Sequence, residues 1–450
     1  MRRELFEVDN RRGNVPLNNR GLPSAQRRTA RWCICACTAE TLLLLIQLYL
    51  AFHYTGGQLS DARSYLDLAS YCAQTKTWYP SAHNLHDTYI FGNGYVNLLA
   101  ACMRIAPGLP WVVVLNILFM QGIVFLSAGI AYRLTDSAVC ASLTSVFVCL
   151  MGGFWGEIVA ARTELCFIML SCLSLYLLFS SRWGFLFLGG VALSLANWVR
   201  PLLVVYLPAA LLFFCLRNTD RKQIAAFLLG ILLTAAVIGE GAYRQIGQFV
   251  FQAQTMGINM LMGANDDADG SYEATVFQEG KAGYVEPEER VNMTFDQIDA
   301  LYKREAIAWI LRHFPRFCSL APAKLFYFLA TDTYGGSAFF NGEVETDNLA
   351  YLLELKDILL GRGNRSFALG DAVVLYSQVS YTLLLLVYLI GVVHAFRKHS
   401  LRQTAHLHLI VLLACGVSVM TVGGARYHMP YLPIFCICAA IEAERFLSHR

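Results

Sequence analysis

The sequence predicts an all-α fold, a polytopic membrane bundle of about 10–12 spanning helices. The first observation behind this prediction is composition. Of 450 residues, 56% are hydrophobic and only 15% are charged, whereas a soluble domain carries roughly 25% charged residues. The second is that apolar runs of roughly 20 residues, the length that crosses a bilayer, recur along the chain. The formal net charge of +3 is too small to suggest a nucleic-acid partner.

The first 31 residues are polar and basic, with eight arginines. The apolar run that follows is long enough to span, and no small-residue cleavage site precedes it, so we do not interpret the segment as a cleavable signal. Positive charge beside a first span predicts that residues 1–31 are cytoplasmic. The first span is then Trp32–His53, which runs from inside to outside.

Residues 54–106 follow as a first outer loop. Within this loop, Phe91–Ile105 is apolar but short and rich in Gly and Asn, so we predict a helix that lies in the outer interface. If this segment crossed the membrane, the basic turns at 217–222 and 397–402 would face outward, against the positive-inside rule. Residues 32–443 therefore form one membrane domain, and a short cytoplasmic tail follows at 444–450.

The remaining spans alternate in direction. They are predicted at 110–131, 138–151, 163–180, 183–195, 201–216, 224–238, 372–396, 405–422 and 429–443. A central outer segment, residues 240–370, interrupts this series, and its first part, up to about residue 306, is hydrophilic and acidic. Residues 307–331 and 347–360 are apolar but broken by charges, and they add a pair of spans if both are membrane helices.

Ionisable residues at the ends of membrane helices are costly, so each is a functional candidate. Under this topology, polar side chains gather on the outer side: Asp61, Glu157, Arg162, Glu164, Asn197, Arg200, Lys324, Arg426 and Tyr427. Cations at a lipid interface suit the phosphate of a membrane-anchored ester, and a carboxylate can remove a proton from an incoming hydroxyl. Structural roles are the alternative: an arginine that reaches toward headgroups, a glutamate that satisfies a helix dipole, or Asp61 as a helix cap.

The segment Gly263–Gly270 contains Asp267-Ala268-Asp269, which resembles a metal-binding D-x-D pattern. No domain that would bind a nucleotide sugar accompanies this pattern, which disfavours a metal site; a divalent metal is possible and is not assigned to named ligands. We interpret Asn265, Asp266 and Asp267 as part of a turn-rich loop near the acceptor. The 14 cysteines lie mostly inside apolar runs without zinc spacing, which indicates small apolar fillers.

Several motifs occur in an order that resembles the GT-C superfamily of membrane glycosyltransferases. The nearest branch in style is the bacterial one related to protein mannosyltransferases and aminoarabinose transferases. The motifs are Ser60–Leu66 after the first helix, Arg162-Thr163-Glu164-Leu165, Asn197-Trp198-Val199-Arg200-Pro201, Gly263-Ala264-Asn265 with Gly270-Ser271-Tyr272, His313-Phe314-Pro315 with Lys324, and Arg426-Tyr427-His428-Met429-Pro430. Here one residue separates His313 from Pro315, where the family motif has the two adjacent.

The resemblance implies a polyprenyl-phosphate sugar donor, an inverting transfer, and a lipid, glycan or protein acceptor. It also implies the plasma (inner) membrane of a bacterium, with the active site facing outward. Asp61 would be the general base or would position the acceptor, and Glu164 would be the second acid. Arg200, Lys324 and Arg426 would bind the lipid phosphate, with Arg162 and Tyr427 beside them. A metal requirement does not carry over.

Two other functions are alternatives. A transporter or flippase of lipid-linked sugars would show inverted repeats and helices broken near the midplane, whereas the polar residues here gather at one end of the predicted bundle. A non-catalytic membrane assembly protein would need neither Asp61 nor Glu164.

Overall fold

A computed structural model describes residues 24–448, apart from residues 59, 273, 345, 347, 348, 364 and 399. These residues are all-α: helices α1 to α18 and short 3-10 turns, without a strand in the described ranges. A single antiparallel bridge joins Ile90 and Gln254. The all-α prediction is confirmed. Most of the predicted basic N-terminal segment, up to residue 23, and the last two residues of the predicted tail lie outside the described residues.

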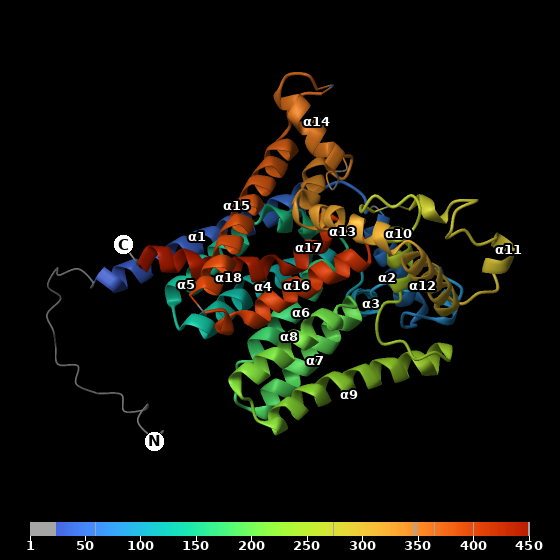
Figure 1. Cartoon of the computed structure of the whole chain (residues 1–450), viewed down its shortest axis with the longest axis horizontal. Coiled ribbons are helices and arrows are strands. Elements are labelled where there is room, and N and C mark those ends of the chain that lie inside the picture. The colour runs from blue at the N-terminus through green and yellow to red at the C-terminus, as the bar shows by residue number, and fades with distance from the viewer. Residues whose placement is uncertain are drawn as a thin grey trace.

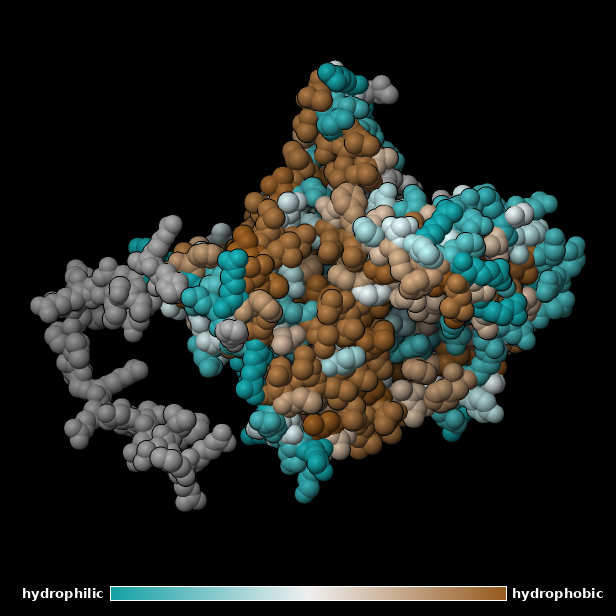
Figure 2. Space-filling view, in the orientation of Figure 1, coloured by the Kyte–Doolittle hydropathy of each residue, from teal (hydrophilic) through white to brown (hydrophobic). Residues whose placement is uncertain are grey.

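Four helices are long and apolar enough to cross a membrane. They are Arg28–His53 of α1 (Ser24–His53), α4 (Trp111–Thr135), α9 (Arg221–Ile246) and α15 (Leu369–Arg397). A fifth candidate is a pair bent by 56°, which joins α5 (Ala138–Leu150) to the 3-10 turns Gly152–Val159. Hydrophobic side chains form a broad face across the bundle, with hydrophilic side chains beside it around α11 and α12 (Figures 1 and 2). A membrane location is consistent with these helices.

The other apolar helices are shorter, with 14 to 17 residues each: α6 (Glu164–Leu177), α7 (Trp183–Val199), α8 (Leu203–Arg217) and α16 (Ala405–Met420). They pack inside the bundle, α6 on α4 and α7, and α8 on α16. Local chemistry sets their ends. Pro201 disfavours helical backbone at Arg200, the residue that follows α7, and Asn218 in the left-handed conformation ends α8.

Two helices of the predicted first outer loop, α2 (Ser60–Thr75) and α3 (Asn93–Ile105), pack against each other, and α3 also lies on α7. As predicted, the segment around Phe91–Ile105 is helical, and its 13 residues are fewer than a span needs. Gly92 permits the close approach of this loop. A Cβ atom there would lie 2.3 Å from the carbonyl oxygen of Val199 and 2.9 Å from Cγ2 of Thr163.

The central segment forms a smaller layer beside the bundle. Its helices are α10 (Met256–Gly263), α11 (Pro287–Arg290), α12 (Phe295–Arg312) and α13 (Phe314–Leu329). Met260, Ile298 and Trp309 belong to a separate hydrophobic core in this layer. Helix α14 (Leu349–Leu359) projects from the bundle, whereas α17 (Ala425–His428) and α18 (Leu432–Ser448) return into it (Figure 1).

Candidate functional site

Asp61 lies in the first turn of α2, where the helix dipole favours a negative charge. The neighbouring Gln58 fixes the segment that precedes this turn. Its amide nitrogen donates to the carbonyl oxygen of Val159 (2.7 Å), and its amide oxygen accepts from the backbone N–H of Ala161 (2.9 Å). The start of α2 is therefore attached to the 3-10 turn Gly156–Val159 and the residues that follow it, just before Arg162.

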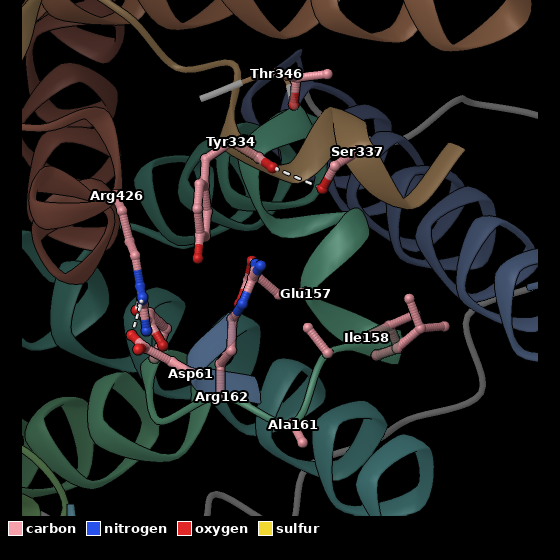
Figure 3. Close-up of polar contacts among 12 residues, drawn as sticks. Asp61, Glu157, Ile158, Ala161, Arg162, Tyr334, Ser337, Thr346 and Arg426 are labelled. Carbon is pink, nitrogen blue, oxygen red and sulfur yellow. Dashed lines mark hydrogen bonds and ion pairs between the residues drawn. The ribbon is translucent and has the colours of Figure 1, made fainter. Parts of the chain in front are cut away.

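Arg426 links the two predicted acids. Its Nη1 donates to Oδ2 of Asp61 (2.6 Å), and its Nε donates to Oε1 of Glu164. Arg200 contacts the same Glu164 oxygen from the other side, with Nη1 at 2.9 Å. Figure 3 shows Arg426 and Asp61 reaching toward each other from separate elements. Four residues that the sequence placed on one side, Asp61, Glu164, Arg200 and Arg426, thus form one ion-pair network.

The two acids differ in exposure. The Asp61 side chain is 40% exposed, and no described residue donates a hydrogen bond to its Oδ1. The Glu164 side chain is 0% exposed, and Oγ1 of Thr163 donates to its second oxygen at 3.3 Å. Both Glu164 oxygens are therefore occupied. This geometry suits Glu164 to holding guanidinium groups in place and leaves Asp61 as the acid that can meet a substrate.

The turn that carries Arg200 is fixed by Asn197. The amide nitrogen of Asn197 donates to Oε1 of Gln252 (2.9 Å), and its oxygen accepts from the backbone N–H of Leu203 (3.0 Å). The ring of Tyr427 lies beside Arg200, with 5.9 Å between its centroid and the guanidinium carbon. Asn197, near the end of α7, thus binds both the start of α8 and the central segment. These contacts fix the turn that carries Arg200, the partner of Glu164.

A second ion pair adjoins the first. Nη1 of Arg162 lies 3.0 Å from Oε1 of Glu157, whose side chain is 1% exposed. The ring of Tyr334 is shared by two cations, because its centroid lies 4.3 Å from the guanidinium carbon of Arg162 and 5.5 Å from that of Arg426. In Figure 3 the Tyr334 side chain points into the space between these two arginines. Such cation–π contacts hold guanidinium groups in fixed positions.

Tyr334 was not predicted from the sequence. The one local signal is the pair Gly335-Gly336 that follows it. Close packing requires both glycines, since a Cβ on Gly335 would lie 2.6 Å from the carbonyl oxygen of Gly153 and one on Gly336 would lie 2.2 Å from Cγ2 of Val374. Similarly, a Cβ on Gly156 would lie 1.8 Å from the carbonyl oxygen of Gly335. Glycines on both segments allow the backbone around Tyr334 to touch the turn that carries Glu157.

Two more tyrosines lie near Asp61: Tyr89, which was not predicted, and Tyr272, which belongs to the Gly-rich motif but was given no role. Burial, followed by the charge of Asp61, raises the pKa of Tyr89 to about 12. The same two causes raise the pKa of Tyr272, which comes from the central segment. The influence of Asp61 on both phenols indicates that they lie near the exposed carboxylate. Aromatic rings at this position can pack on the apolar face of a sugar.

The ion-pair network and the adjoining Glu157–Arg162 pair are together balanced in formal charge. Their three carboxylates, Asp61, Glu157 and Glu164, face three guanidinium groups, those of Arg162, Arg200 and Arg426, so that −3 and +3 sum to zero. Each guanidinium has five N–H donors, and Arg426 uses two of them on its carboxylate partners. Donors therefore remain for the oxygens of an anionic ligand.

Lys324 lies apart from this network. It is on α13, completely buried, and Nζ donates to the carbonyl oxygen of Val419 at 2.8 Å. The ring of Phe317 lies 4.7 Å from Nζ, and no described carboxylate pairs with the ammonium group. Burial lowers the pKa of Lys324 to about 8. The residue adjoins the Gly-rich loop, because a Cβ on Gly263 would lie 3.1 Å from Nζ.

The polar side chains of the Gly-rich loop bind within their own layer. Asn265 donates to the carbonyl oxygen of Leu261 (2.8 Å), Asp266 accepts from Nε1 of Trp309 (2.8 Å), and Asp267 pairs with Nζ of Lys281 (2.7 Å). Across the described part of the chain, no group of three or more His, Cys, Asp or Glu side chains could hold a metal ion. The contacts therefore favour the interpretation of this loop as a turn-rich structure.

Comparison with the models of known protein families finds no match, and a search of curated proteins finds none either. The residues of the site therefore have to carry the functional argument.

Proposed function

We propose that this protein is an integral membrane glycosyltransferase that moves a sugar from a polyprenyl-phosphate donor to an acceptor on the outer face of the membrane. The acceptor is a lipid, a glycan or a protein. In this proposal α5, α6, α7, α8, α16 and α18 cross the membrane together with the four longer helices, which gives ten spans. The balance of basic turns then directs the Asp61 end of the bundle outward.

The observation that carries the proposal is the asymmetry of Asp61. One carboxylate oxygen is held by Arg426 at 2.6 Å, and the other has no donor among the described residues. A general base needs this combination of a fixed position and an open lone pair. The ionisable groups around Asp61 lie at helix ends, which favours an interfacial reaction over a transport path through the midplane.

The reaction follows from these positions. The acceptor hydroxyl passes its proton to Oδ1 of Asp61 while its oxygen attacks the anomeric carbon from the side opposite the phosphate. The bond between that carbon and the phosphate oxygen breaks, and the phosphate keeps the electron pair, so the anomeric configuration inverts. Arg200 and Arg426 stabilise the charge that grows on the leaving phosphate. Lys324 is completely buried and lies apart from these arginines, so the proposal leaves it outside the phosphate site.

The test is transfer by purified full-length protein in lipid nanodiscs, with radiolabelled polyprenyl-phosphate sugars and a panel of acceptors. We expect Asp61→Asn to lower the rate of transfer by roughly 10²–10⁴-fold, the usual contribution of a general base. Asp67→Asn is the matched control, because Asp67 lies on the same helix, is 71% exposed and pairs with Arg63. Full transfer by Asp61→Asn, or equal losses in both variants, would exclude Asp61 as the base.

A further inference from the structure

A cavity of about 230 Å³ lies among the ends of three helices. The proposed reaction does not use this cavity. Its walls are the end of α4 at Leu134, the end of α8 at Phe213, Leu216 and Arg217, and the start of α16 at His406, with Arg402 and Gln403 in the turn before it. Segments distant in sequence thus enclose one space with both cationic and apolar walls.

The cavity lies at the opposite end of these helices from Asp61. Helix α8 begins three residues after Arg200 and ends at Arg217, and its 15 residues rise about 22 Å. Helix α16 runs the other way, from Ala405 beside the cavity to Met420, and Arg426 follows shortly after. One helix length therefore separates the cavity from the ion-pair network.

Two guanidinium groups at this cavity have no carboxylate partner among the described residues. Arg217 lies against aromatic rings, with its guanidinium carbon 4.9 Å from the centroid of Phe179 and 5.0 Å from that of Phe213. Arg402 donates from Nη2 to the carbonyl oxygen of Leu216 at 3.0 Å. Both cations are thus positioned by neutral groups, and their other N–H donors are unneutralised. This contrasts with Arg162, Arg200 and Arg426, which all bind carboxylates.

The remaining walls of the cavity are formed by an imidazole, an amide and apolar side chains. His406 is 2% exposed, has no hydrogen-bond partner in the described part of the chain, and packs its ring edge against Phe213 at 4.8 Å. Gln403 donates from Nε2 to the carbonyl oxygen of Leu134, which fixes the turn over the end of α4. Leu134 and Leu216 supply apolar surface beside the cations.

We propose that this cavity binds a phosphate oxyanion between Arg217 and Arg402, with the imidazole of His406 at its base. Two planar guanidinium groups without carboxylates match the oxygens of phosphate in charge and geometry. The phosphate comes either from the headgroup of an anionic phospholipid, whose chains lie on the apolar walls, or from free phosphate. This site is independent of the glycosyltransferase proposal.

The test uses full-length protein in an uncharged detergent. The thermal unfolding midpoint is followed during titration with phosphatidylglycerol, with phosphatidylcholine of the same chains, and with inorganic phosphate. We expect a saturable rise of the midpoint with phosphatidylglycerol and none with phosphatidylcholine. A rise with inorganic phosphate alone assigns the free anion, and a rise with phosphatidylglycerol alone assigns the lipid headgroup.

Variants localise the effect. We expect Arg217→Gln combined with Arg402→Gln to weaken binding at least tenfold, whereas Arg221→Gln, a neighbouring exposed arginine outside the cavity, keeps wild-type binding. The single charge reversal Arg402→Glu serves if the double variant does not fold, and it should also abolish the rise. The proposal is overturned if neither phosphate source raises the midpoint of the wild type, or if the cavity variants and Arg221→Gln respond equally.

Discussion

At the scale of single residues, Arg426 determines how the candidate site is arranged. It contacts a fully enclosed acid, Glu164, and a half-exposed acid, Asp61, with the same guanidinium group. A buried ion pair is costly to break, because the remaining charge has no water to solvate it, whereas an exposed pair contributes little. The two carboxylates should therefore respond differently to neutralisation.

We expect Glu164→Gln to lower the free energy of unfolding by about 3 kcal/mol, since it leaves Arg200 and Arg426 without a buried anion. Asp61→Asn should cost about 1 kcal/mol or less, because the Asp61 side chain is 40% exposed. Thermal unfolding of both variants in detergent measures the difference. Equal stabilities would contradict the assignment of a holding role to Glu164.

Lys324 gives a prediction about pH. Burial lowers its pKa in the folded protein to about 8, from 10.5 for an ordinary lysine. Between these values the unfolded chain binds more protons than the folded one, so stability increases as pH rises through this window. The unfolding midpoint of the wild type should therefore rise relative to that of Lys324→Met from pH 8 to pH 10.5. Parallel pH profiles of the two proteins would refute the prediction.

The sequence allowed six charged residues of the site, Asp61, Glu157, Arg162, Glu164, Arg200 and Arg426, to be grouped on one side, because each lies near a helix end with an unusual charge for a membrane protein. It could not identify Tyr334, Tyr89 or Tyr272 as site residues, since tyrosines are common in this chain and only tertiary packing brings these three near the charges. Lys324 and the Gly-rich loop were grouped with the site because the predicted topology places them on the same side of the membrane. In the structure the loop binds within the smaller layer, and Lys324 on α13 donates to the carbonyl oxygen of Val419 on α16.

At the scale of elements, the positions of the helices were predictable from the sequence, but the number of helices that cross the membrane was not. Predicted segments such as 138–151 and 405–422 agree closely with α5 and α16. The number of membrane crossings was harder to predict because several of the helices are short. The predicted spans 163–180 and 201–216 correspond to helices of 14 and 15 residues in the structure. A helix this short cannot be identified as membrane-spanning from its length alone.

The contact between the first outer loop and the bundle gives a prediction at this scale. Gly92→Ala should destabilise the protein by about 1–3 kcal/mol, because its Cβ would lie 2.3 Å from the carbonyl oxygen of Val199 and would push α3 away from the turn that carries Arg200. Gly241→Ala in α9 is the control, since no atom lies within 4 Å of that Cβ. It should be neutral or slightly stabilising. Thermal unfolding measures both, and a neutral Gly92→Ala would contradict this packing.

At the scale of the whole molecule, the proposed orientation is testable with reporters. Inserted into the turn at Asn218, between α8 and α9, a reporter should lie on the cytoplasmic side. The same reporter at Gly280, in the central segment, should lie on the outer side. Reporters whose activity depends on the compartment measure this in intact cells. Both insertions on one side would refute the proposed topology.

The ion pair between Asp61 and Arg426 also has a consequence for the synthesis of the protein, because the two residues are 365 positions apart. At about 5–20 residues per second, roughly 20–70 s pass between their translation. During that time Asp61 and Glu164 are already in the nascent chain without their shared cation. Charged groups left unpaired in a membrane are the kind of defect that quality-control proteases and chaperones can detect. The ion pair thus distinguishes a chain that extends through Arg426 in α17 from one that ends before it.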